Sequence, residues 1–331
     1  MSNEIYPKKQ FFCKENRVFF TFFAFWSIMK YHLNKHRKDV AYLAFTRHEK
    51  EGVIYYTSPL FDKLGIPHFF ASRIGGVSEG DFGSLNISTS RKNSDGKADS
   101  MQNVRENLRR GLSLIGKTEL SACMMKQVHD VNVISAFPVC SQYFDGVSEC
   151  EACDGIFCSH GDPIDTLCVK TADCVPILLY DLTHDVACAL HAGWRGTVNG
   201  ICGCAVRTLR AIYGQGEIVC AIGPCIHECC YEVDDKVLKA AIDGAEASGI
   251  PRNIAENCFP QRYTVDGQNK YRVSLPALNK MFLQAEGVRE ENISVCELCT
   301  CCAEDENGKI FFSHRASGGF SGTQMSVVAL K

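Results

Sequence analysis

Three residues whose side chains can bind a metal ion lie in or at the ends of strand-like segments. His129 closes the segment MKQVH, Cys174 lies within KTADCVP, and His191 closes ACALH. Two imidazoles and one thiolate suit zinc, and a catalytic zinc site uses three protein ligands with one position left for water or substrate. The short interval between Cys174 and His191 fits adjacent strands joined by a turn, whereas His129 has to arrive from a separate strand. The three residues are therefore a candidate zinc site.

The same residues permit two other interpretations. Cys174 and His191 can form a thiolate–imidazole pair for nucleophilic catalysis, with Asp173 nearby. That interpretation excludes the metal site, because a coordinated thiolate is a poor attacking group. A structural role is the other alternative, since free cysteine is among the most buried residue types and a strand-ending histidine is often hydrogen-bonded within the core. Spacing alone leaves all three open.

Candidate anion-binding residues lie in three glycine-containing segments. Arg73 stands near the start of the loop SRIGGVSEGDFGSLN, which is dense in turn-forming residues and ends at Asn86. Arg195 lies between two glycines at the expected start of a helix, where free backbone N–H groups and the helix dipole favour an anion. Arg315 lies in the loop SHRASGG. We expect these four side chains to contact the substrate or a phosphate.

The elements that must position these side chains follow from apolar periodicity and from turn residues. Strand-like and helix-like segments alternate from Tyr42 to the end, which predicts one mixed α/β domain over residues 43–331. In chain order we expect a helix over 103–116, a strand over 123–137, an irregular insertion over 138–153, strands over 166–181 and 186–192, a helix ending at Gly214, a strand over 217–224, helices starting near 234 and spanning 274–288, and two strand-like pieces around a loop over 309–330.

Residues 1–42 differ in composition from the rest and are interpreted as an amino-terminal appendage. Their apolar run VFFTFFAFWSIM has 12 residues and is flanked by basic residues. Crossing a bilayer takes roughly 20 apolar residues, and no small-residue cleavage site follows the run. We expect a packing or interfacial helix here rather than stable membrane insertion.

Composition narrows the function class further. A net charge of −3 over 331 residues gives no general attraction to nucleic acid or to an anionic membrane. The 20 cysteines are spread along apolar runs, which favours core thiols in a reducing, cytoplasmic compartment. The C-x-x-C pairs in CEAC (150–153) and CELCTCC (296–302) could build a four-cysteine zinc site, but incidental clustering is the simpler interpretation. No His-x-His pair occurs among the ten histidines, which argues against a multicopper centre.

Seven motifs follow one another along the chain: SRIGGVSEGDFGSLN, KQVH, CDGIF, KTADCVPILLYD, HAGWRGT, IGPCI with YEV, and FFSHR. In this order they resemble the YfiH family, also called laccase-domain proteins, whose animal branch is FAMIN-like. The resemblance covers roughly residues 43–331. It implies an α/β sandwich around a mixed β-sheet, with one zinc ion on His129, Cys174 and His191. It also implies purine nucleosides and inorganic phosphate as substrates, and it leaves a homodimer open.

The activities that the resemblance implies are phosphorolysis of adenosine, inosine, guanosine and methylthioadenosine, and deamination of adenosine. Zinc rather than copper is the expected metal, because the chain has no His-x-His pair. A zinc-bound hydroxide would attack the amino-bearing carbon of adenine, as in zinc nucleobase deaminases. We expect the arginines to hold the phosphate and Asp154 and Asp173 to orient the histidines or to move protons. The segment SGTQ (321–324) departs from the Thr-Gly-Arg found in many bacterial members, so an arginine contact is missing there. A metal-free cysteine hydrolase and a non-catalytic redox or scaffold protein remain the alternatives.

Overall fold

Two large sheets form the centre of the protein. The computed structural model describes residues 44–137, 141–144 and 147–331. The whole expected appendage over 1–42, with its apolar run over 18–29, therefore lies outside the described residues. Within the described part, one sheet has eight strands in the order β1-β2-β3-β19-β9-β4-β7-β6 and a second has six in the order β16-β12-β10-β11-β8-β5. No helix among these residues is both long and apolar enough to cross a bilayer.

Most strands of these sheets are short. The strands of the eight-stranded sheet are β1 (Thr46–Lys50), β2 (Val53–Thr57), β3 (His68–Ala71), β4 (Ala122–Lys126), β6 (Ser141–Phe144), β7 (Val147–Ala152), β9 (Thr166–Thr171) and β19 (Gln324–Ala329). Those of the six-stranded sheet are β5 (Val133–Ser135), β8 (Gly155–Ser159), β10 (Val175–Asp181), β11 (Val186–Ala192), β12 (Ile218–Ile222) and β16 (Ile293–Val295).

Smaller elements surround the two sheets. Two small sheets consist of β13 (Glu232–Val233), β14 (Gln261–Val265) and β15 (Gln268–Arg272), and of β17 (Glu304–Asp305) and β18 (Gly308–Lys309). The helices are α2 (Pro59–Lys63), α3 (Met101–Ser113), α4 (Trp194–Val198), α5 (Ile201–Tyr213), α6 (Asp235–Ala247), α7 (Arg252–Glu256) and α8 (Leu275–Ala285), with short 3-10 turns at Gly80–Phe82, Glu119–Ser121 and Glu290–Asn292.

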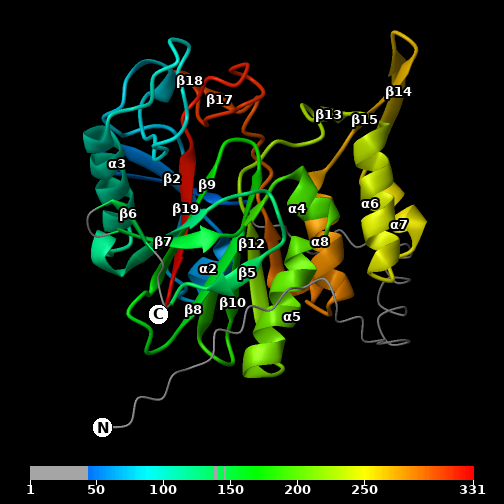
Figure 1. Ribbon diagram of the computed structural model, residues 1–331, viewed down its shortest axis with the longest axis horizontal. Helices are drawn as coiled ribbons and strands as arrows, with labels where there is room; N and C mark the ends of the chain where they lie inside the picture. The colour runs from blue at the N-terminus through cyan, green and yellow to red at the C-terminus, as the bar shows by residue number, and fades with distance from the viewer. Residues whose placement is uncertain (1–43, 138–140, 145–146) are drawn as a thin grey trace.

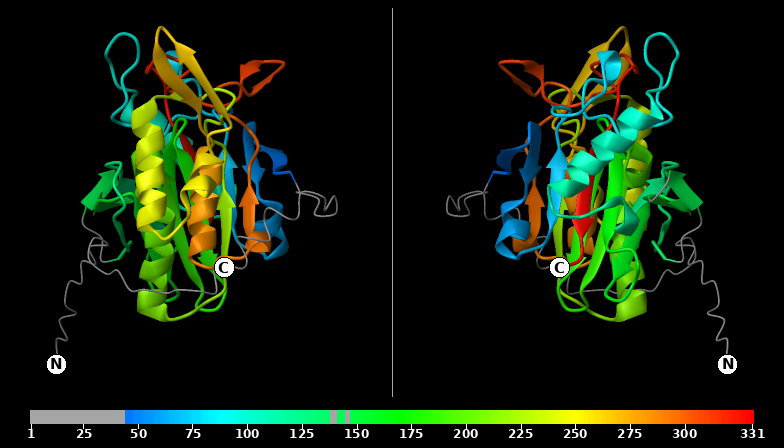
Figure 2. Two further views of the ribbon diagram at one scale, coloured as in Figure 1. Left: turned by 90° about the vertical axis from the view of Figure 1, so that its right-hand side faces the viewer. Right: turned by 90° about the vertical axis from the view of Figure 1, so that its left-hand side faces the viewer.

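Alternating side chains divide the core into three layers. In β10, Ile177 and Leu179 face the cluster under α5, α6 and α8, whereas Leu178 and Tyr180 face the cluster between the two sheets. A third cluster lies between the eight-stranded sheet and α3. Strands that are buried on both faces have continuous apolar sequences, because neither face meets water. The order is therefore helix, sheet, sheet, helices, with α3 on the left and α5, α6 and α8 on the right of Figure 1; the side views show each helical layer from outside (Figure 2).

The expected α/β sandwich is confirmed, with its sheet divided into two. Several expected elements are also confirmed, namely α3, α5, α6, α8, β11 and β12. The apolar face predicted for α3 is fully buried at Val104, Leu108 and Leu112. The helix after the glycine turn differs in one respect: α4 comes first, and α5 starts only after Gly200, whose φ of +74° suits a residue without Cβ.

Three predicted elements are wrong, and each error lies where the chain changes direction. The segment 123–137 is not one strand but β4 and β5, which belong to different sheets. The segment 166–181 likewise divides into β9 and β10 of different sheets. The stretch expected to be an irregular insertion, 138–153, contains β6 and β7 at one edge of the eight-stranded sheet. Apolar runs on either side of such a bend look alike in sequence, because both ends are buried.

The last expected pair of strands is only half present. β19 forms as predicted, but residues 310–313 are buried without joining a sheet, and the strand before them, β18, already ends at Lys309. The backbone of Phe312 is instead paired with a side chain: Phe312 N donates to Gln324 Oε1 (2.8 Å), and Gln324 Nε2 donates to Phe312 O (3.3 Å). These two hydrogen bonds give the Gln324 amide a structural role. Gln324 belongs to the SGTQ segment, which replaces the Thr-Gly-Arg of many bacterial members.

Candidate metal and active site

Three crossings between the sheets meet at one end of the molecule. The chain passes from the eight-stranded to the six-stranded sheet between β4 and β5, between β7 and β8, and between β9 and β10. β4 pairs in parallel with both β7 and β9, so the carboxyl ends of these three strands lie at the same edge. The crossings carry His129, Asp154 and Cys174 in turn. The fold thus gathers side chains that are distant in sequence.

His191 reaches the same edge from within the six-stranded sheet. It lies in β11, which pairs antiparallel with β10 so that His191 stands opposite Pro176. Cys174 precedes β10 by one residue and is therefore brought next to the histidine, as the short interval between them predicts. His129 differs from the expectation, because it sits in the turn after β4, with φ +64°, rather than at the end of a strand.

One buried carboxylate positions both histidines. Asp154 is fully buried, and its Oδ1 lies 2.7 Å from His191 Nδ1. Its Oδ2 accepts the backbone N–H groups of Val128 (3.2 Å) and Asp130 (2.7 Å), the two neighbours of His129. Because a carboxylate only accepts, Nδ1 carries the proton in the neutral form of His191, and Nε2 is then the nitrogen that can bind a metal ion.

The three candidate ligand atoms converge. The ligand atoms of His129, Cys174 and His191 all lie within 4.8 Å of one another. The two imidazole rings are nearly perpendicular, at 88°, with centroids 4.8 Å apart. Exposure decreases across the set, from exposed His129 through Cys174 to His191, which is 3% exposed. One side of the group is therefore open to solvent, as a catalytic metal site requires.

The electrostatics of the group favour a deprotonated sulfur. Burial would raise the pKa of Cys174, but His191 and His129 outweigh it and lower this pKa to about 6. Burial would lower the pKa of His191, but the Cys174 thiolate and the Asp154 carboxylate raise it to about 9. Burial likewise opposes ionisation of Asp154, and hydrogen bonds from His191 and Asp130 nevertheless lower its pKa. The thiolate, which is the metal-binding form of cysteine, is thus the stable form here.

Gly193 leaves the space in which these side chains meet. A Cβ at this position would lie 3.0 Å from His129 Cδ2 and 3.4 Å from Cys174 Sγ. The φ of Gly193 is −66°, which any residue adopts, so the glycine is needed for space and not for its backbone freedom. This close approach and the donor set of two imidazoles and one thiolate fit a zinc ion.

Asp173 is placed differently from Asp154. Its φ is +86°, and its carboxylate accepts the Thr300 hydroxyl (2.7 Å) and the Arg315 backbone N–H (2.7 Å). Both oxygens therefore hold loops of the carboxy-terminal part against the crossing that carries Cys174. A catalytic role for Asp173 stays a prediction, and the geometry shows a positioning role.

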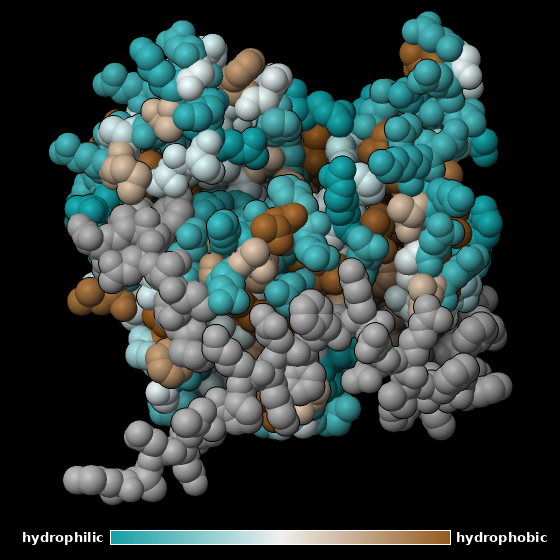
Figure 3. Space-filling model, in the orientation of Figure 1, coloured by the Kyte–Doolittle hydropathy of each residue, from teal (hydrophilic) through white to brown (hydrophobic). Residues whose placement is uncertain are grey.

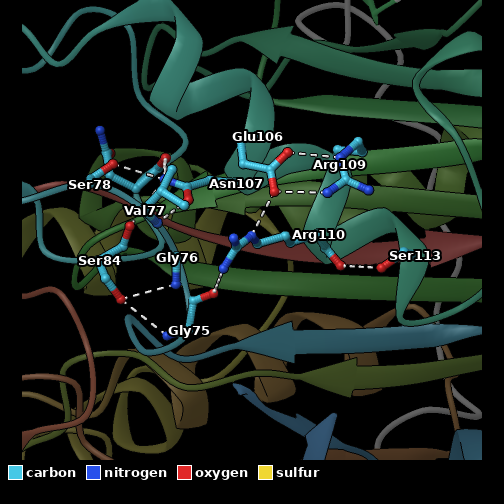
Figure 4. Close-up of polar contacts among 11 residues, drawn as sticks. Gly75, Gly76, Val77, Ser78, Ser84, Glu106, Asn107, Arg109, Arg110 and Ser113 are labelled. Atoms are coloured by element: carbon cyan, nitrogen blue, oxygen red, sulfur yellow. Dashed lines mark hydrogen bonds and ion pairs between the residues drawn. The ribbon is translucent and has the colours of Figure 1, made fainter. Parts of the chain in front are cut away.

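The glycine-rich loop with Arg73 is fixed from two sides. Asn107 of α3 accepts the backbone N–H of Val77 (2.8 Å) and donates to Ser78 Oγ (2.8 Å), as Figure 4 shows. Arg110 of the same helix donates to Gly75 O (3.0 Å). Among the expected contact residues, Arg73 donates through Nε to Gly83 O (2.5 Å) and stacks on Phe312.

Asn86 lies inside the protein rather than at its surface. The residue is fully buried, and its Oδ1 accepts the backbone N–H groups of Ser88 (2.9 Å) and Thr323 (3.0 Å). Its Nδ2 donates to Ser88 O (3.1 Å) and Asp99 Oδ2 (2.9 Å). The amide thus joins the loop to the segment before β19. Substrate contact by Asn86 stays a prediction.

Arg195 and Arg315 both lie near Tyr231, an aromatic residue that sequence reasoning missed. Burial raises the pKa of Tyr231 to about 12, with a further contribution from Cys174, while Arg315 and Arg195 oppose the rise. The Arg315 guanidinium stacks on the Tyr231 ring at 5.2 Å, and that of Arg195 stacks on Trp194 at 4.5 Å. Tyr231 thus lies within electrostatic reach of the thiol and both arginines. The YEV motif of the resemblance was the only signal for it.

The guanidinium groups of Arg315 and Arg195 differ in their hydrogen bonds within the protein. Arg315 donates to Cys230 O and Glu232 O, both at 3.3 Å. Arg195 is exposed, and within the described residues its side chain makes no hydrogen bond, only the stacking contact with Trp194. The loops before α3, the β17–β18 pair and the β14–β15 hairpin stand around this end of the sheets, and a notch separates the last two in the space-filling view (Figure 3).

Comparisons with known proteins identify relatives of this chain. A family model described as multi-copper polyphenol oxidoreductase laccase matches residues 67–331. Purine nucleoside phosphorylase YlmD of Geobacillus stearothermophilus is 33% identical over 276 residues, covering 80% of this chain and 93% of that protein. Adenosine deaminase RL5 of an unknown prokaryotic organism is 35% identical over 155 residues, covering 46% of this chain and 54% of that protein.

A solved structure shows the same fold. The crystal structure of YlmD from Geobacillus stearothermophilus superposes with a TM-score of 0.71 at 28% identity, covering 87% of this chain and 98% of that one. The match of fold, the length of the matched segment and the order of the motifs lead to one conclusion. The chain belongs to the laccase-domain family, also called the YfiH family.

Proposed function

We propose that this protein is a purine nucleoside phosphorylase that also deaminates adenosine, with one zinc ion held by His129, Cys174 and His191. The observation that carries the proposal is the convergence of these three ligand atoms within 4.8 Å beside an open face. The relatives named purine nucleoside phosphorylase and adenosine deaminase support the same two activities. We include adenosine, inosine, guanosine and methylthioadenosine as substrates, because the family resemblance implies them.

Zinc in this position would supply a Lewis acid and lower the pKa of bound water. Asp154 holds His191 in the tautomer that leaves Nε2 free, and it fixes the turn of His129 through two backbone N–H groups. Gly193 keeps the approach to the ligands open. Asp154 and Gly193 therefore act by positioning the three candidate ligands. The substrate would approach the ligands from the exposed side, where His129 lies.

Phosphorolysis also needs a cationic site for phosphate. Arg195 is the strongest candidate, because its exposed guanidinium has no hydrogen-bond partner within the described part of the chain. Arg315 and Arg73 are weaker candidates for phosphate binding, because each already donates a hydrogen bond to a backbone carbonyl. A guanidinium stabilises phosphate by paired charge-assisted hydrogen bonds, and electrostatic stabilisation of the departing charge is the main catalytic contribution in such reactions.

The second candidate is a metal-free cysteine hydrolase. The low pKa of Cys174 and the high pKa of His191 favour it, because together they describe a thiolate–imidazolium pair. A nucleophilic cysteine needs only one imidazole as its base. Here a second imidazole, that of His129, also lies within hydrogen-bonding reach of the Cys174 sulfur. That third side chain favours the metal site.

Product analysis separates the two candidates. The full-length protein is incubated with adenosine, inosine or methylthioadenosine, with and without phosphate, and the products are separated by chromatography. Free base that appears only with phosphate, together with some inosine from adenosine, supports the proposal. Loss of both reactions on zinc chelation and their return on adding zinc support the metal site, whereas activity that survives chelation and is abolished by a thiol alkylator indicates the hydrolase. His191→Ala should abolish both reactions, and loss of deamination alone would separate them.

We also propose that residues 43–331 are the catalytic unit and that residues 1–42 are an appendage without a role in the chemistry. A chain beginning at residue 43 should then keep the kcat/KM of the full chain for inosine phosphorolysis. A cytoplasmic location and a homodimer stay predictions.

A further inference from the structure

Four cysteines outside the candidate active site converge at the surface. They are Cys229 and Cys230, from the loop that follows β12, and Cys299 and Cys302, from the loop that follows β16. Their sulfur atoms all lie within 4.8 Å of one another, and Cys229 Sγ is 3.6 Å from Cys302 Sγ. We call this group the tetrad.

Backbone pairing holds the two loops together without help from the sulfurs. β12 and β16 are parallel neighbours, so both loops leave the same edge of the six-stranded sheet. A parallel bridge then joins Cys225 to Cys299, and Thr300 N donates to Cys225 O (2.9 Å). His227 O accepts from the backbone N–H groups of Cys230 (2.9 Å) and Tyr231 (2.8 Å), which closes a turn that presents the two adjacent cysteines.

The spacing of the sulfurs fits one tetrahedral ion better than disulfides. A zinc–sulfur bond of about 2.3 Å places the four sulfurs of a tetrahedron about 3.8 Å apart, whereas a disulfide requires about 2.05 Å. The 3.6 Å between Cys229 and Cys302 matches the first value. The Cys299-x-x-Cys302 segment also has the ligand interval found in structural zinc sites.

A hydrogen bond to sulfur provides a second, independent sign of a thiolate site. The backbone N–H of His227 donates to Cys299 Sγ at 3.4 Å. Cys299 is buried at 6% exposure, whereas Cys229 and Cys302 are exposed. Backbone donors around a ligand sulfur stabilise its negative charge, as outer partners of metal ligands do.

We propose that the tetrad binds a second zinc ion with a structural role. Four protein ligands leave no position for water or substrate, so this ion would not take part in the chemistry. Its position gives it another consequence. Thr300, between two tetrad residues, donates to Asp173, and Arg315 donates to Cys230 O. The ion would therefore stabilise the loops that surround Cys174 and Tyr231.

The direct test is the zinc content of purified full-length protein, measured by elemental analysis against protein concentration. The wild type is expected to hold two zinc ions per chain, and Cys229→Ser/Cys302→Ser to hold one. The matched control is Cys301→Ser, in the same loop but outside the tetrad, which should keep two. The decisive quantity is the difference of one zinc ion between wild type and double variant, whatever the candidate active site holds. A double variant with as much zinc as the wild type, or iron in place of the zinc that is lost, would overturn the proposal.

A second measurement needs no variant and so does not depend on folding of the mutant. The protein as isolated is treated briefly with an alkylating reagent, and labelled cysteines are located by tandem mass spectrometry. Cys229 and Cys302 are exposed, so bound metal would protect them relative to Cys301, and a chelator should remove that protection. Labelling of Cys229 and Cys302 as fast as Cys301 before chelation, or a tetrad disulfide in the isolated protein, would refute the second site. Neither result bears on His129, Cys174 and His191, so the proposed function is tested separately.

Discussion

Replacing Asp154 by asparagine isolates the effect of one buried charge on the candidate metal site. The variant has nearly the same shape, but one carboxylate oxygen becomes an NH₂ group. The two backbone N–H groups of Val128 and Asp130 both need an acceptor, so we expect the amide oxygen to remain with them. The NH₂ group then faces His191 Nδ1, which has to give up its proton and become an acceptor. The proton moves to Nε2, the nitrogen that a metal ion needs.

The size of the effect follows from this change of tautomer. Loss of an outer partner of a metal ligand lowers metal affinity by about 10- to 100-fold, which corresponds to about 1.4–2.8 kcal/mol. The range agrees with about 1.5–3 kcal/mol for a hydrogen bond to a charged group. We therefore expect the zinc affinity of Asp154→Asn, measured by competition with a chelating dye, to fall by one to two orders of magnitude. The kcat of phosphorolysis at saturating zinc should fall less.

The chain provides a matched control at the other end of β10. Asp181 is also fully buried, its Oδ2 lies 2.8 Å from His184 Nδ1, and its Oδ1 accepts the backbone N–H of Thr183 (2.9 Å). Val175, the residue after Cys174, is roughly 20 Å away along the strand. Asp181→Asn should lower the thermal unfolding midpoint about as much as Asp154→Asn and leave zinc affinity within twofold of wild type. Equal zinc affinity in the two variants would refute the positioning role of Asp154.

Three further predictions follow from the same geometry. Gly193→Ala should weaken zinc binding about tenfold in the same dye assay, because the new methyl group would press on His129 and Cys174 and such overpacking costs about 1–3 kcal/mol. An unchanged zinc affinity would mean that the site relaxes freely around the methyl group. Arg195→Ala should raise the KM for phosphate about 10- to 100-fold in initial-rate assays and leave the KM for inosine nearly unchanged. A change in the KM for inosine alone would show that Arg195 does not bind phosphate. Zinc uptake at pH 7.5 by Cys229→Ser/Cys302→Ser, which lacks the tetrad, should release about one proton, seen by calorimetry in buffers of different ionisation enthalpy. Cys174 (pKa about 6) is already a thiolate at this pH, while His191 (pKa about 9) must lose its proton. The affinity should therefore rise with pH up to about 9, and a pH-independent affinity between 7 and 9 would contradict the assignment.

The sequence predicted the elements whose pattern depends on one helical face or on end signals. Val104, Leu108 and Leu112 recur at helical spacing, and all three are fully buried in α3. Ser274 and Gly287 bracket α8 as expected. The convergence of Cys174 and His191 was predictable too, because it depends only on two neighbouring strands and a short turn.

The sequence did not reveal where the chain changes sheets. The crossings at His129 and Asp173 depend on positive φ values of +64° and +86°, and neither residue is a glycine that would signal them. Each is held by long-range bonds, such as those from Thr300 and Arg315 to Asp173. Local propensity contains no information on such partners, so two crossings were interpreted as continuous strands.

The tetrad shows the same dependence on tertiary pairing. The C-x-x-C pairs in CEAC and CELCTCC were the only spacing signal for a four-cysteine site, and incidental clustering was the simpler interpretation. Cys150 Sγ in fact lies 3.3 Å from Cys123 Sγ in the core. The actual partners of Cys299 and Cys302 are the adjacent Cys229 and Cys230, which match no spacing rule. Only the parallel pairing of β12 with β16 brings these loops together.

Strand pairing also explains why Asp154, and not Asp173, orients His191. Asp154 ends the crossing into β8, and β8 pairs with β11 so that Gly155 stands opposite Leu190. Asp154 is therefore beside His191, one residue along each strand, and His191 N donates to Asp154 O (2.8 Å) as the ladder continues. Asp173 is adjacent to Cys174 in sequence, but its left-handed backbone turns its carboxylate toward Thr300 and the Arg315 backbone. In this fold the neighbour across the sheet, rather than the neighbour in the chain, determines which carboxylate orients the candidate metal ligand His191.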